Sequence, residues 1–200
     1  MRIYRNNDLR LMGAGEYIVK KVENSNNWKY PQPSERRWNE QRSIEVCRSI
    51  DEGIFLGICT LETADDGSLI EIIDGRERTA VLYEMYHPEV RTDKRLLMQI
   101  GKDEYDENEF VYVSPDYKPD EVFEFWVSDV ANTFALVATF NDINSRQEKM
   151  FTHVRERLNN FNKYFQSSTI GLSLITFDNK MLGDNKEIQR IRLRGRLNRT

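Results

Sequence analysis

Apolar and polar positions alternate with a period that changes along the chain, and each change predicts a new element. Ile44, Cys47 and Ile50 recur at helical spacing within residues 38–52, and Gly53 follows them, so a helix is expected to end there. The same reasoning predicts three further helices: one that begins near residue 75 and ends before Pro88, one over residues 128–143 that Ser128 caps, and one over residues 147–165 with the stripe Met150, Val154, Leu158 and Phe161.

Short runs rich in β-branched and aromatic residues predict strands, and the residues between them favour turns. The expected strands cover residues 16–22, a hairpin or neighbouring strands within 54–73, and residues 109–114 and 169–177. Residues 12–15 and 31–37 are expected to be loops. This order lacks the regular alternation of a doubly wound sheet, so the predicted fold class is α+β, with a small mixed sheet packed against helices.

The composition favours one compact domain over residues 1–200. With 200 residues and 39% apolar content, the chain can close one full-sized core but hardly two. No apolar run is long enough to span a membrane and no secretory signal is evident, so we expect a cytoplasmic protein. Cys47 and Cys59 are not in metal-binding spacing and lie beside apolar residues, so we expect buried free thiols.

The step between a strand and a helix at residues 71–86 carries the motif Asp74-Gly75-Arg76-Glu77-Arg78. One interpretation is purely structural: Asp74 caps the helix and Glu77, three residues later, completes a capping box.

The other interpretation is an anion site. A helix N-terminus presents unpaired backbone N–H groups, and the guanidinium groups of Arg76 and Arg78 can close over a phosphate. Glu77 would then turn aside, hold Mg²⁺ or orient a water.

Three stretches, in order, resemble the ParB/sulfiredoxin-like fold. The motif is similar to the "DGERR" form of ParB-type proteins and to the "DGQQR" form of the N-terminal domain of GmrSD-type restriction subunits. "PSERRW" at residues 33–38 and "FNDINSRQEKM" at residues 140–150 resemble two further segments of the restriction-type family. The resemblance spans about residues 30–150. Arg76 and Glu77 stand where that family has two glutamines, which affects hydrolysis more than binding.

This resemblance implies a domain that binds a nucleoside triphosphate, with Mg²⁺-dependent hydrolysis as a further activity, and a role in defence against foreign DNA or in DNA partition. Carried onto this chain, it makes Asp74 and Glu77 the candidate catalytic residues. The candidate nucleotide-binding residues are Gly75, Arg76, Arg78, Arg36 and Asn144. A homo-oligomer and a separate nuclease partner are both compatible with this expectation.

The C-terminal segment 186–200 is strongly basic, with Glu187 as its one acidic residue. If it forms a strand, one face carries a row of arginines that could contact the phosphates of DNA or RNA: Arg190, Arg192, Arg194 and Arg196. The alternative is a solvated strand edge, or a tail that binds acidic loops of the same protein.

No metal site is predicted apart from nucleotide-associated Mg²⁺. His87 and His153 are not in metal-binding spacing, and the acidic residues 102–109 lack the spacing of a calcium loop. We therefore expect no stand-alone His-dependent nuclease. The alternative function is a non-catalytic DNA-binding or assembly protein, encoded by a phage or plasmid, that retains the same scaffold.

Overall fold

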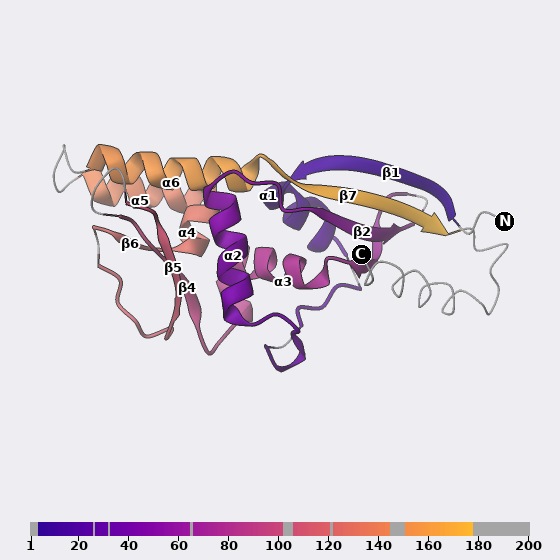
Figure 1. Cartoon of the computed structure of the whole chain (residues 1–200), viewed down its shortest axis with the longest axis horizontal. Helices are drawn as coiled ribbons and strands as arrows, with labels where there is room; N and C mark the ends of the chain where they lie inside the picture. Colours follow the sequence, from indigo (N-terminus) through magenta and orange to yellow (C-terminus); the bar gives the residue numbers. More distant parts are fainter. Residues whose placement is uncertain are drawn as a thin grey trace.

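The computed structural model describes residues 4–177, except 26, 32, 65, 102–105, 121 and 145–150 (Figure 1). Its strands are β1 (Tyr4–Gly13), β2 (Ile58–Thr63), β3 (Leu69–Asp74), β4 (Arg95–Gln99), β5 (Glu109–Val113), β6 (Glu124–Trp126) and β7 (Ser168–Phe177). Its α-helices are α1 (Ala14–Tyr17), α2 (Glu40–Asp51), α3 (Arg76–Tyr86), α4 (Val127–Ala131), α5 (Thr133–Asn144) and α6 (Phe151–Gln166). A π-helical turn, Ile18–Val22, continues α1, and 3₁₀ turns cover Pro33–Glu35 and Pro88–Val90.

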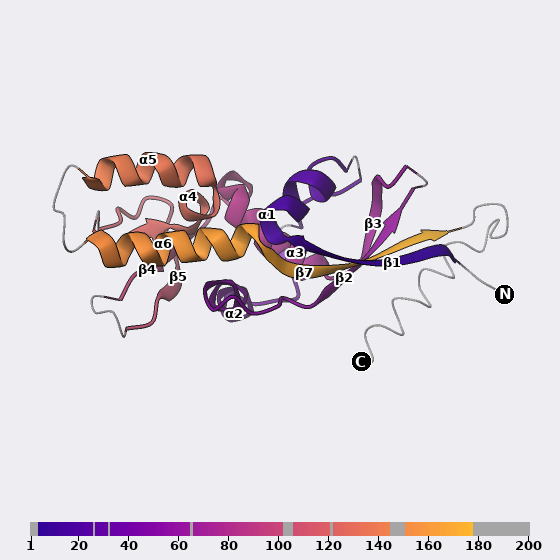
Figure 2. The ribbon, with the colours of Figure 1, turned by 90° about the horizontal axis from the view of Figure 1, so that it is seen from above.

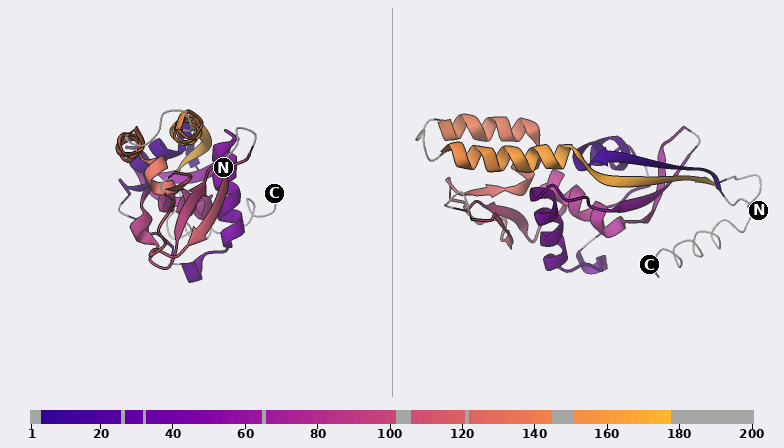
Figure 3. Two further views of the ribbon diagram at one scale, coloured as in Figure 1. Left: turned by 90° about the vertical axis from the view of Figure 1, so that its left-hand side faces the viewer. Right: turned by 45° about the horizontal axis from the view of Figure 1, so that its top comes forward.

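Two small sheets organise the chain, as the α+β prediction requires. The first is mixed, with the order β1-β7-β2-β3, in which β2 and β7 are parallel and the other neighbours antiparallel. The second is antiparallel, with the order β5-β4-β6. The α5–α6 pair lies at one end of an elongated molecule and β1, β2 and β7 reach toward the other, with α2 and α3 between them (Figures 1 and 2). The end view shows α5 and α6 side by side, above the second sheet (Figure 3).

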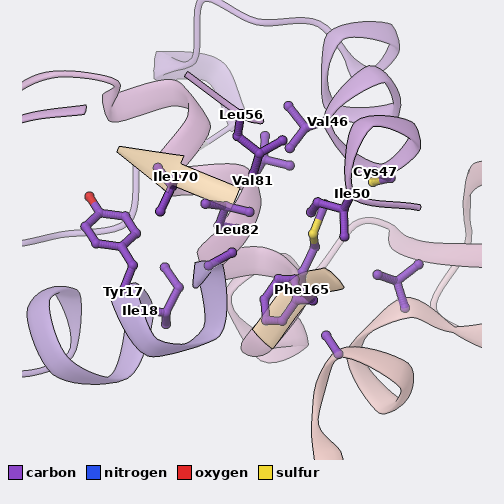
Figure 4. Close-up of a cluster of buried hydrophobic side chains, with 14 of the residues drawn as sticks. Tyr17, Ile18, Val46, Cys47, Ile50, Leu56, Val81, Leu82, Phe165 and Ile170 are labelled. Atoms are coloured by element: carbon purple, nitrogen blue, oxygen red, sulfur yellow. The ribbon is translucent and has the colours of Figure 1, made fainter. Parts of the chain in front are cut away.

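One continuous hydrophobic cluster joins the two sheets. Leu61 and Leu172 contribute to it from the mixed sheet, and Met98 and Phe110 from the antiparallel one. Figure 4 shows its centre, where side chains from the α1 region, α2, α3 and α6 meet. Burying each large aliphatic side chain contributes about 1.5–3 kcal/mol, so this shared core holds both sheets in one body.

The sequence periodicity predicted the central elements correctly. Helix α2 begins after Asn39, whose side chain accepts a hydrogen bond from the Arg42 N–H at 3.0 Å. It ends where Gly53 has φ +68° and the Ile54 N–H donates to Ser49 O at 2.7 Å, a Schellman-type ending. The hairpin within residues 54–73, the helix before Pro88, the strand at residues 109–114, most of the helix over residues 147–165, and the last strand are also confirmed.

Residues 16–22 and 12–15 were predicted wrongly, and two strands were missed. Residues 16–22 are helical rather than a strand, because Tyr17, Ile18 and Val22 face the core while Val19 is exposed. Residues 12–15 are not a loop, since they join β1 to α1, and neither β1 nor β4 was predicted.

The helix expected over residues 128–143 is divided in two. Helix α4 starts at Val127, so Ser128 is not its cap. The chain then breaks at Asn132, whose side-chain oxygen accepts hydrogen bonds from Phe134 N and Ala135 N and so caps α5. None of the described helices combines the length and apolar character needed to cross a membrane.

Candidate functional site

The turn between β3 and α3 depends on Gly75. This residue is the N-cap of α3 and has φ +86°, a left-handed conformation that favours glycine. A Cβ atom here would lie 2.3 Å from the Sγ atom of Cys59, so the close approach of β2 also requires glycine. The motif therefore has a glycine because two separate constraints exclude a side chain.

The capping box predicted for this helix is not formed. Asp74 is the last residue of β3, and the cap position belongs to Gly75. The first intrahelical bond runs from Thr79 N to Gly75 O at 2.9 Å, and within the described residues no side chain caps the helix. The backbone N–H groups of Arg76, Glu77 and Arg78 therefore remain available at the positive end of α3.

A cleft of about 530 Å³ opens in front of this helix end. Its walls come from the segment before α2, from the end of β3 and from the first turn of α3. The lining residues are Pro31, Glu35, Arg37, Trp38, Ile72, Ile73, Asp74, Gly75, Arg76, Glu77 and Arg78. The volume is typical of small-molecule sites.

Three arginines line the cleft, and within the described residues none of their guanidinium groups pairs with a carboxylate. Arg78 donates from Nη1 to Ile58 O at 3.2 Å and to Cys59 Sγ at 3.7 Å, which leaves its Nε and Nη2 groups without protein partners. The side chains of Arg76 and Arg37 form no hydrogen bond or ion pair with described residues. The wall therefore carries three guanidinium groups without ion-pair partners among the described residues, beside the lining carboxylates of Glu35, Asp74 and Glu77.

Cys59 supports Arg78 as a neutral group. Both Cys47 and Cys59 are buried and free, as predicted. Burial raises the pKa of the Cys59 thiol, and the neighbouring Arg78 lowers it only in part. The thiol therefore stays protonated near neutral pH and donates to Gly75 O at 3.8 Å. We infer a packing role for Cys59 rather than a nucleophilic one.

Glu77 turns away from the helix end and fastens the preceding segment. Its carboxylate accepts hydrogen bonds from Arg37 N at 3.1 Å and Trp38 N at 3.4 Å, and lies 3.8 Å from Arg36 Nε. The carboxylate that would repel an anion is thus engaged by two backbone donors and one cation. Its structural effect is to hold the cleft wall against α3.

Arg36 lies beneath the cleft and not on its wall, so the structure does not support its direct contact with phosphate. Its side chain is buried and donates from Nη1 to Glu84 at 2.9 Å and from Nη2 to Ser43 at 3.2 Å. Burial by itself lowers the pKa of Arg36, but the charge and hydrogen bond of Glu84 together with the neighbouring Tyr30 and Tyr112 raise it overall. Arg36 therefore positions the segment that carries Arg37 and Trp38.

Glu84 is shared between two buried arginines. Arg91 Nη1 lies 3.6 Å from its other oxygen, and Arg91 also bonds with Glu40 and Asp93. Burial and the charge of Glu84 raise the pKa of Tyr30 to about 12, so its hydroxyl stays protonated and donates to Glu84. Removing one partner from such a buried set typically costs about 3–5 kcal/mol.

Asp74 is the carboxylate in the cleft without a protein partner. Among the described residues, its side chain forms no hydrogen bond or ion pair, and the expected pairing with Arg78 is not made. No group of three or more His, Cys, Asp or Glu side chains suited to a metal occurs in the described part of the chain. Mg²⁺ is nevertheless commonly held by one or two carboxylates together with substrate phosphates, and Asp74 fits that requirement.

Of the remaining predicted residues, Asn144 is the one whose position the structure describes. Helix α5 ends with Asn144 at the end of the molecule opposite β3, so the structure does not bring Asn144 to the cleft (Figure 2). The arginines Arg190, Arg192, Arg194 and Arg196 lie outside the described residues. Arg37 was not predicted, although its position within the "PSERRW" segment was an available signal.

Both histidines have structural contacts. His153 Nε2 lies 3.0 Å from Gly101 O, and His87 caps the end of α3 between Glu23 and Glu89.

Comparisons of the sequence with protein-family models and with curated proteins find no match. The function of the cleft must therefore be argued from its geometry.

The requirement for glycine at residue 75 can be tested against a matched glycine. Gly75→Ala should lower the free energy of unfolding by about 2–4 kcal/mol, because it combines left-handed strain with contact against Cys59. Gly67→Ala should cost only about 1–2 kcal/mol, since Gly67 has φ +80° but nothing within 4 Å of a new Cβ. Urea denaturation measures both, and equal losses would contradict the proposed contact.

Proposed function

We propose that this protein binds a nucleoside triphosphate, with the phosphates in the cleft at the N-terminus of α3. The observation that carries the proposal is that Arg37, Arg76 and Arg78 line one cleft without carboxylate partners, beside an uncapped helix end. Such a helix end favours negative charge, and guanidinium forks match phosphate oxygens. This arrangement agrees with the resemblance of the motif to the ParB/sulfiredoxin-like fold, which remains part of the proposal.

Different groups of the cleft bind different phosphates of the nucleotide. Backbone N–H groups at the start of α3 donate to one phosphate, while the unused Nε and Nη2 groups of Arg78 and the guanidinium of Arg76 bind the others. Arg37 closes the opposite wall, in the position that Glu77 and Arg36 give to its segment. The backbone groups and Arg78 are held before the ligand arrives, whereas the side chains of Arg37 and Arg76 lose conformational entropy on binding.

Hydrolysis is the second part of the proposal, and it assigns the catalytic role to Asp74. Mg²⁺, when bound with the nucleotide, would neutralise charge on the phosphate oxygens. The Asp74 carboxylate is free to hold that ion or to orient the attacking water. Glu77 contributes by keeping the cleft wall in place, because its carboxylate is already engaged.

Nucleotide binding can be tested by replacing arginines of the cleft and, as a control, an arginine elsewhere on the surface. Arg76→Ala and Arg78→Ala should each raise the Kd for the preferred nucleotide about tenfold or more, because each removes charge-assisted hydrogen bonds. Arg48→Ala should change it less than about twofold, since Arg48 lies exposed on α2 and does not line the cleft. The measurement is calorimetric titration with ATP, GTP, CTP and UTP at one ionic strength. A double variant of Arg76 and Arg78 that binds like the wild type would refute the proposal.

The catalytic role of Asp74 has a separate test. Asp74→Asn should slow Mg²⁺-dependent phosphate release about a hundredfold, because it removes the free charge, while Kd without Mg²⁺ changes less than about threefold. Asp66→Asn, in the exposed turn after β2, serves as the control. Normal turnover in Asp74→Asn would exclude this role. A wild-type protein that binds nucleotide but releases no phosphate would favour the non-catalytic alternative.

A DNA-related role, in defence or partition, rests on the basic segment 186–200, which lies outside the described residues. Changing Arg190, Arg192, Arg194 and Arg196 to Gln should abolish duplex binding at physiological salt. It should also reduce the slope of log K against log salt by about three to four, because each phosphate contact contributes about 0.9. Fluorescence anisotropy over a salt series measures both quantities. Unchanged affinity and slope would exclude the segment as a DNA-binding surface.

A further inference from the structure

A second hollow, of about 400 Å³, adjoins the cleft and shares Ile72 and Arg76 with it. One wall is the edge strand β3, and the other is the segment that follows the π-helical turn. The remaining lining residues are Ser25, Asn27, Trp28, Lys29, Leu69, Ile70 and Glu71. The lining thus combines three aliphatic side chains and one indole ring with polar and charged residues, whereas the first cleft is lined mainly by charged residues.

Trp28 is held in place before any ligand arrives. Its backbone N–H donates to Ser25 Oγ at 3.2 Å, and Ser25 Oγ donates to Leu69 O at 3.1 Å, which ties the segment to β3. The indole ring also meets the ring of Tyr83 edge to face, with centroids 6.3 Å apart. A fixed aromatic side chain at the wall of a hollow is suited to contact with a flat ligand.

The indole N–H of Trp28 lacks a hydrogen-bond partner among the described residues. Its Nε1 atom is buried and has no hydrogen-bond acceptor among the described residues. Buried donors are normally satisfied, and a tryptophan N–H usually finds a partner. Trp28 lines the adjoining hollow, so a ligand there that draws the Nε1 atom toward it would supply the missing acceptor.

We infer that this hollow binds the nucleobase of the nucleotide whose phosphates occupy the neighbouring cleft. The inference rests on the proposed function and extends it from phosphate binding to recognition of the base. A nucleobase combines a flat aromatic face with hydrogen-bond acceptors at its edge, which suits the indole ring and its free N–H. Arg76 lies at the boundary of the two hollows, where the ribose and the first phosphate join the base.

The test compares nucleotides with inorganic triphosphate, which carries the charge but lacks the base. For the preferred nucleotide, Trp28→Ala should raise Kd about tenfold and Trp28→Phe about fivefold, because the first removes the aromatic face and the second keeps a smaller aromatic face without the N–H donor. The Kd of inorganic triphosphate should stay within about twofold in both variants, which also shows that they fold. Trp126→Phe, on β6 beneath Arg95, is the matched control and should bind both ligands normally.

Tryptophan fluorescence locates the base independently, because the chain has three tryptophans and Phe can replace each in turn. Nucleotide-induced quenching should disappear only in Trp28→Phe. Quenching that disappears instead in Trp38→Phe would place the base in the phosphate cleft and overturn the inference. Equal affinity of the wild type for nucleotides and inorganic triphosphate would also overturn it, yet leave the phosphate site intact. Failure to bind any of these ligands would refute the proposed function itself.

Discussion

The buried carboxylate of Glu84 is the interaction on which the architecture around the cleft depends. It lies on α3 and meets Arg36, from the segment before α2, and Arg91, from the segment after α3. These arginines in turn bind Ser43 and Glu40 on α2. The guanidinium of Arg91 also lies over the ring of Tyr112, on β5, at 4.3 Å. A single charge therefore connects both central helices with the second sheet, and the low dielectric of the interior makes an unpaired member costly.

The geometry of the cleft follows from this constraint. Arg36 is fixed by Glu84, and it lies 3.8 Å from Glu77, whose carboxylate receives the N–H groups of Arg37 and Trp38. One wall is thus anchored through side chains in the interior. The other wall is set by backbone, because Gly75 must lie against Cys59 for β3 to turn into α3. The cleft is consequently preorganised, with its three arginines mounted on elements that cannot easily shift.

Local sequence signals were enough to predict the strand-to-helix step at the motif and most of the central helices and strands. Gly53, Gly75 and Pro88 end or begin helices by backbone restrictions that a sequence displays directly. The signals failed where distant contacts decide the outcome. Residues 16–22 contain β-branched and aromatic residues that favour a strand, but the core they meet is made by α3 and α6. Strand β4 lies in a charged region of the sequence, so it can be recognised as a strand only from its pairing with β5 and β6.

The same distinction applies to the site residues. Asp74, Gly75, Arg76 and Arg78 are adjacent in sequence, and the structure brings them to one cleft as expected. Arg36 was predicted to contact phosphate, but in the structure it pairs with Glu84. This pairing could not be predicted, because Glu84 lies 48 residues away and no local pattern connects the two. Similarly, the capping box failed because left-handed Gly75 takes the cap position and frees Glu77 for a long-range contact.

The charges of the motif are therefore less unfavourable to an anion than the sequence suggests. Glu77 stands where the restriction-type family has a glutamine, and in sequence this substitution places a negative charge in the first turn of α3. In the folded chain, however, Arg37 N, Trp38 N and Arg36 all face that carboxylate. The two backbone hydrogen bonds end on different oxygens, Oε1 and Oε2, so a glutamine, which has one oxygen and one NH2 group, could keep only one of them. With Glu77 engaged, three guanidinium groups line the cleft together with the carboxylates of Asp74 and Glu35, and this balance of charge is compatible with phosphate binding.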